Sequence, residues 1–80
     1  MLRKYLQAAM DKAHYEVLAD DNTLLGTIPG FQGVYSNAPT QEACRDELEE
    51  VLEEWLFFRI SQGMTVPEVD GIRLIIEEVV

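Results

Sequence analysis

The segment 41–62 constrains the fold most, because it is the longest stretch of the chain with the features of one helix. It is rich in Glu and Leu, Thr40 is a good N-cap before it, and Gly63 is a typical stop after it. A helix with one apolar stripe needs another element to cover that stripe. The stripe consists of Cys44, Leu48, Val51, Leu52 and Trp55.

The hydrophobic period changes near His14. Over residues 1–13, apolar side chains recur at helical spacing, which predicts an amphipathic helix. From His14 to Ala19 apolar and polar residues alternate, as in a strand. The segment 20–22 is Asp-Asp-Asn, which favours a turn, and residues 24–28 predict a second strand.

Two further strands are predicted. Pro29 and Gly30 suit the centre of a type II turn, and a short third strand follows at Gly33–Ser36. Residues 72–76 alternate again and predict a final strand. The expected fold class is therefore α+β: an N-terminal helix, a three-stranded antiparallel meander, a long helix packed on one face of the sheet, and a last strand.

Length and charge narrow the function classes. Eighty residues predict a single domain over 1–80, with 1–13 as an N-terminal helix extension and no DNA-binding domain. The net charge of −9, from 15 acidic and 6 basic side chains, argues against direct binding to nucleic acid or an anionic membrane. The same negative charge is compatible with binding to a basic partner.

Localisation is expected to be cytoplasmic. Cys44 is the only cysteine, so no intramolecular disulfide is possible and a reducing compartment is the simplest expectation. Residues 1–13 lack the continuous apolar core of a signal peptide, and no run approaches the about 20 apolar residues of a membrane span.

The candidate interface lies at the end of the long helix, where apolar residues nearly encircle it. Successive helical residues are about 100° apart, so one sheet cannot cover all of them. The N-terminal helix covers the second side, or the group is a surface for self-association or a partner. We expect a homodimer or higher homo-oligomer. The residues are Trp55, Leu56, Phe57, Phe58 and Ile60.

Four acids on the same helix are candidates for steering a basic partner, although such acids also occur simply as a solvated face. Carboxylates four residues apart can hold a metal, but this spacing is common on exposed helices, and no metal or other cofactor is expected. The acids are Glu49, Glu50, Glu53 and Glu54.

No catalytic site is recognisable. His14 has no second His or paired Cys, so it cannot supply the about four ligands of a zinc site, and no nucleophile accompanies it. Cys44 falls on the apolar stripe, where a thiol is usually inert packing. The glycines at 26, 30 and 33 match no phosphate-binding loop. The chain is therefore not expected to be an enzyme.

Three motifs follow one another along the chain: Ile28-Pro29-Gly30-Phe31-x-Gly33-Val34, Thr40-x-Glu42-Ala43 and Gly63-x-x-Val66-Pro67. In this order and spacing they resemble the HicB-like antitoxin family of bacterial and archaeal type II toxin–antitoxin systems. The resemblance extends from Tyr15 to Leu74, and Phe31 stands where the family usually has a cysteine.

The resemblance implies a partner: a small basic ribonuclease toxin that cleaves messenger RNA and is inhibited stoichiometrically. Two alternatives stay open. One is a homo-oligomeric adaptor or regulator of unrelated partners, and the other is a small enzyme that uses acidic residues and a divalent ion. A small basic protein encoded beside the chain would favour the antitoxin.

Overall fold

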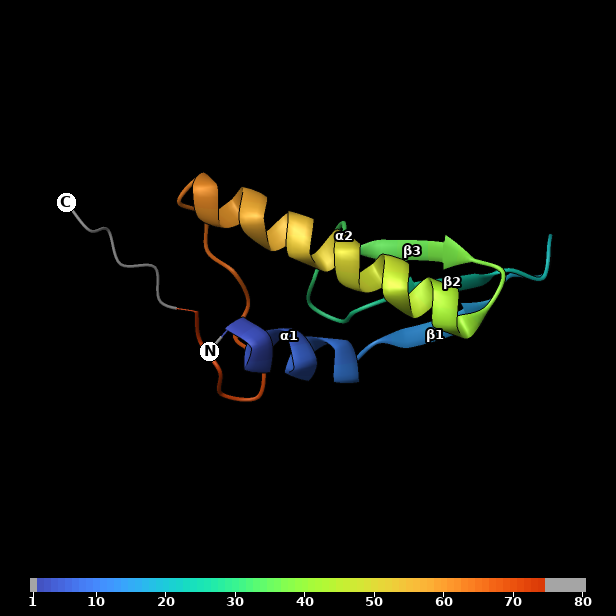
Figure 1. Ribbon diagram of the computed structural model, residues 1–80, viewed down its shortest axis with the longest axis horizontal. Coiled ribbons are helices and arrows are strands. Elements are labelled where there is room, and N and C mark those ends of the chain that lie inside the picture. Colours follow the sequence, from blue (N-terminus) through green and yellow to red (C-terminus); the bar gives the residue numbers. More distant parts are fainter. Residues whose placement is uncertain (1, 75–80) are drawn as a thin grey trace.

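The computed structural model describes residues 2–74, in which one long helix lies along a small sheet and a short N-terminal helix packs beside the long one (Figure 1). The element order is α1 (Leu2–Asp11), β1 (His14–Val17), β2 (Leu24–Thr27), β3 (Tyr35–Ala38) and α2 (Gln41–Ser61). The strands form one antiparallel sheet in the order β1-β2-β3. With α2 lying along one face of this sheet, the fold class is α+β, as predicted.

The turn between β1 and β2 follows the chemistry of its acidic sequence. Asn22 has a φ of 58°, a left-handed conformation that asparagine tolerates. The Asp21 carboxylate accepts hydrogen bonds from the hydroxyl of Thr23 at 2.7 Å and from its backbone N–H at 3.1 Å. These two bonds lower the pKa of the Asp21 carboxyl below its ordinary value.

Two consecutive turns connect β2 to β3. Phe31 N–H donates to the Ile28 carbonyl at 3.1 Å, and Val34 N–H donates to the Phe31 carbonyl at 3.2 Å. Gly30 and Gly33 occupy the third positions of these turns, with φ of 86° and 90°. The positive φ at Gly30 is what a type II turn requires after Pro29.

The predicted bounds of the third strand were wrong by two residues at each end. Gly33 belongs to the second turn, so β3 begins at Tyr35 and not at Gly33. It continues to Ala38, because Asn37 and Ala38 pair with β2. The Asn37 side-chain amide also donates to the Leu24 carbonyl at 2.9 Å, which ties this end of β3 to its neighbour.

The chain after α2 returns to the first helix (Figure 1). The Tyr5 hydroxyl donates a hydrogen bond to the Pro67 carbonyl, and the Lys12 ammonium lies 2.8 Å from the Asp70 carboxylate. A tight turn follows, closed by a bridge between Val69 and Ile72. The predicted strand at 72–76 has no regular structure at 73 and 74, and its remaining residues lie outside the described range.

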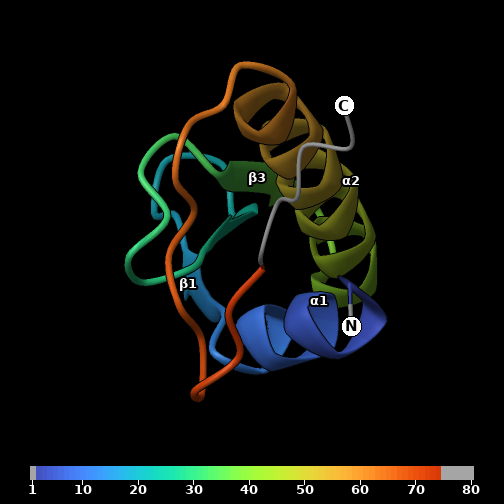
Figure 2. The same ribbon diagram turned by 90° about the vertical axis from the view of Figure 1, so that its left-hand side faces the viewer.

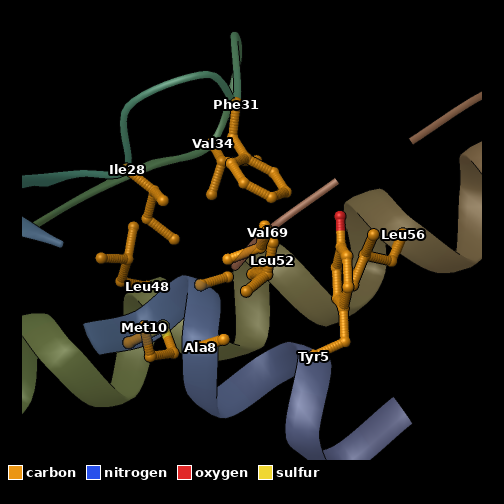
Figure 3. Close-up of a cluster of buried hydrophobic side chains, with 11 residues drawn as sticks. Tyr5, Ala8, Met10, Ile28, Phe31, Val34, Leu48, Leu52, Leu56 and Val69 are labelled. Atoms are coloured by element: carbon orange, nitrogen blue, oxygen red, sulfur yellow. The ribbon is translucent and has the colours of Figure 1, made fainter. Parts of the chain in front are cut away.

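The hydrophobic core lies where the helices meet the turns after β2 and the returning chain (Figures 2 and 3). Tyr5 of α1 is fully buried and its ring lies edge-on to Phe31, with the centroids 6.3 Å apart. The other buried members come from α1, from 28–34, from α2 and from the returning chain: Ala8, Ala9, Met10, Ile28, Val34, Leu48, Leu52, Leu56 and Val69.

The N-terminal half of α2 approaches the sheet closely at Gly26. The Ser36 hydroxyl is buried and donates to the Cys44 carbonyl of α2 at 2.8 Å. A Cβ on Gly26 would lie 2.8 Å from Ser36 Oγ and 3.1 Å from Cys44 Sγ. Glycine at this position therefore sets the distance between helix and sheet.

Candidate protein-interaction surface

The apolar group at the end of α2 divides between the interior and the surface. Leu56 is 2% exposed and belongs to the core, whereas Phe57 and Phe58 are 77% and 58% exposed. Ile60 is half-buried. Of the predicted interface residues, Phe57 and Phe58 are therefore accessible to a partner, whereas Leu56 is not.

Trp55 is held within the domain by an aromatic partner and a cation. Its ring centroid lies 5.4 Å from that of Phe31. The guanidinium of Arg59 stacks 4.7 Å above the indole, and its Nε–H donates to the Thr65 carbonyl at 2.9 Å. Trp55 thus links α2 to the turns after β2 through Phe31, and Arg59 links α2 to the returning chain through Thr65.

The helix α1 covers part of the apolar group and forms one wall of a groove. The two helices lie side by side (Figure 2), and the groove between them has a volume of about 470 Å³. Leu2 and Leu6 line it from α1, and Leu56, Phe57 and Ile60 line it from α2. Phe58 is not among its lining residues. The N-terminal helix therefore covers one side of the group without closing it.

The candidate steering acids border this groove. Glu53 and Glu54 line it, while Glu49 lines an adjoining hollow together with Arg3 and Arg45. Glu49, Glu50, Glu53 and Glu54 are all exposed, and none of them pairs with a basic side chain elsewhere in residues 2–74. Of the four, Glu53 and Glu54 therefore place negative charge beside Phe57 in the groove.

The two residues considered for chemistry occupy ordinary structural positions. His14 is exposed on β1, and Cys44 is fully buried against Ser36, with Sγ 3.2 Å from the hydroxyl oxygen. Within the described part of the chain, no group of three His, Cys, Asp or Glu side chains is arranged to hold a metal ion.

A second hollow, of about 610 Å³, was not anticipated from the sequence. It lies beside Trp55 and Arg59 and is walled by the turn at Gly30 and by residues 65–67. The spacing of four between Trp55 and Arg59 indicates a helical pair, but nothing in the sequence shows that residues 65–67 fold back beside it.

The fold and this surface define a small α+β domain with an apolar groove bordered by acids. Residues 4–67 match the UPF0150-like family, and the chain belongs to that family. The crystal structure of TTHA0281 from Thermus thermophilus is similar to it, with 35% sequence identity over 96% of this chain and 95% of that one. Its TM-score is 0.90.

No curated protein matches the chain. Within residues 2–74, neither helix combines the length and the apolarity that crossing a membrane requires.

Proposed function

We propose that this chain is a protein-binding domain of the HicB-like antitoxin type, which inhibits a small basic ribonuclease and has no catalytic activity of its own. The observation that carries the proposal is the combination on one helix of two exposed phenylalanines, Phe57 and Phe58, with four exposed acids. Large exposed apolar side chains grouped on a small domain are typical of protein-binding surfaces.

The charge of the surface fits such a partner. A ribonuclease needs positive charge to hold RNA, and a domain with a net charge of −9 would be attracted to the same surface. Opposite surface potentials mainly raise the association rate, whereas buried apolar contacts mainly slow dissociation. The acids would therefore guide the encounter, and apolar contacts in the groove, above all at Phe57, would hold the complex.

Association kinetics test this proposal with the small basic protein encoded beside the chain. Reversing Glu53 and Glu54 to Lys should slow association, because the attraction near the groove is lost. The effect should shrink with added salt, since the Debye length falls from about 10 Å at 0.1 M. Reversing Glu49 and Glu50 gives a second variant.

The matched control reverses Glu16 and Asp20, which are also exposed but lie on β1 and in the turn after it. It changes the net charge equally, so a general charge effect would slow all variants alike. Equal association rates for all variants and the wild type would refute steering by α2. Absence of both binding and inhibition of RNA cleavage by the wild type would refute the antitoxin proposal.

A second candidate is a homo-oligomeric adaptor. The observation that favours it is the exposure of Phe58, which lies outside the groove and is left uncovered by both α1 and the returning chain. A second copy that packs on Phe58 would bury it and leave the groove open to another protein.

A further inference from the structure

We infer that the groove between α1 and α2 binds an amphipathic helix that carries basic residues beside its apolar stripe. The inference rests on the proposed function, because the helix that binds in the groove would belong to the partner protein. The bound helix would occupy the groove and would not contact Phe58, which lies outside it.

The walls of the groove decide which kind of element fits. Both walls are helices, which pair their backbone N–H and C=O groups internally except in the terminal turns and present no row of free groups of the kind that a sheet edge offers. An extended strand would find no backbone partners there, and its own polar groups would lose water without replacement. A helix brings its backbone groups already paired and can lay one apolar stripe into the groove.

The apolar lining supplies the contact for that stripe. Leu2 and Leu6 lie one helical turn apart on α1, and Phe57 and Ile60 lie one turn apart on α2. This arrangement presents two short rows of apolar side chains to the groove. A ligand helix meets such rows with residues at i, i+3 or i+4, and i+7. Phe57 is the most exposed of the four, and so it gains the most from being covered.

The negative charge beside the groove favours a ligand helix with basic side chains next to its apolar stripe. Glu53 and Glu54 line the groove, both are exposed, and neither pairs with a basic side chain among residues 2–74. Arg3 and Arg45 lie in the adjoining hollow that shares Leu2 and Leu6 with the groove. Lysine or arginine on the ligand is therefore favoured beside Glu53 and Glu54, the acids that line the groove itself.

The same charges disfavour a second copy of this chain as the occupant. In a twofold dimer each surface patch faces its own counterpart. Glu53 and Glu54 of both copies would then lie in one interface, so like charges would share a site from which water is partly removed. Like charges brought together in this way oppose association.

The test uses an 18-residue fluorescent peptide with leucines at helical spacing and lysines elsewhere, and measures its anisotropy with the full-length chain. A second peptide carries glutamates in place of the lysines. The wild type should bind the lysine peptide and not the glutamate peptide. Phe57→Asp should weaken binding of the lysine peptide by about tenfold or more, because an aromatic anchor is lost and a charge enters the site.

Phe58→Asp is the matched control, since it makes the same substitution at the next position of the same helix. Both variants add one negative charge, and charge alone would strengthen binding of a basic peptide. Loss of affinity only in Phe57→Asp therefore reports the groove. Melting temperatures near that of the wild type should accompany both variants, because both side chains are exposed.

Three results would overturn the inference: similar affinity for the two peptides, equal effects of the two substitutions, or a wild-type dimer in light scattering that Phe57→Asp alone dissociates. Inhibition of the ribonuclease without peptide binding would also overturn it and leave the proposed function standing. Peptide binding in the groove without inhibition of the ribonuclease would leave the inference standing and refute the proposed function.

Discussion

Gly26→Ala is expected to destabilise the domain, although this exchange often stabilises proteins. The φ of Gly26 is not positive, so alanine would normally gain about 0.4–1 kcal/mol by restricting the unfolded chain. Here the new methyl group would lie 2.8 Å from Ser36 Oγ, 3.1 Å from Cys44 Sγ and 3.3 Å from Cε1 of Tyr15. Overpacking of this kind costs about 1–3 kcal/mol.

The steric cost should exceed the gain, because the closest atom cannot move freely. Ser36 is buried, and its hydroxyl is held by the bond to the Cys44 carbonyl. The net loss should be about 1–2 kcal/mol in the free energy of unfolding. For a domain of this size, that lowers the melting temperature by roughly 4–8 °C per kcal/mol.

Thermal unfolding of Gly26→Ala, Ser36→Ala and the double variant provides the assay. Ser36→Ala alone should cost about 1 kcal/mol through its lost hydrogen bond. It also removes the atom nearest to the added methyl group, so the double variant should be more stable than the sum of the single effects predicts. The coupling energy should be about 0.5 kcal/mol or more. Additive effects, or an unchanged melting temperature in Gly26→Ala, would refute the steric argument.

Three further outcomes are expected. Removing residues 1–13 should lower the melting temperature, because Tyr5 is fully buried in the core that α1 shares with α2 and the turns; an unchanged melting temperature would show that α1 is dispensable. Burial raises the pKa of the Tyr5 hydroxyl above its ordinary value of 10.0, so its contribution to stability is present below pH 10 and is lost as pH rises through the folded-state pKa. Tyr5→Phe should therefore flatten the stability curve above pH 10, as measured by urea unfolding, and a curve as steep as that of the wild type would contradict this. Light scattering should give a mass above the 9.1 kDa monomer, reduced by Phe58→Asp, and a monomeric wild type would exclude the homo-oligomer.

The helices and the first turn were predictable because their determinants are local. Residues 41–62 carry their own cap, and the Thr40 hydroxyl oxygen does accept a hydrogen bond from Ala43 N–H at 3.1 Å. The bounds of β3 were not predictable in the same way. Gly33 fits either a strand or a turn, and the pairing of Asn37 with β2 depends on a register that both turns determine together.

The candidate surface was predictable in composition but not in exposure. The order of residues 55–58 fixes their angular positions around the helix. Which of those positions are covered depends on where α1 and the turn at Phe31 pack, and these contacts are distant in sequence. For this reason Leu56 and Phe57, adjacent and both apolar, end in opposite environments.

Because Cys44 is buried, the reactivity of its thiol reports local opening of the domain. Its thiol is fully shielded between α2 and the sheet, and it is the single cysteine of the sequence. A thiol-labelling reagent can react only in molecules whose helix has separated from β2 and β3, so the labelling rate measures how often that separation occurs. A ligand that stabilises this half of the domain would slow labelling, and no cysteine would have to be introduced by mutation.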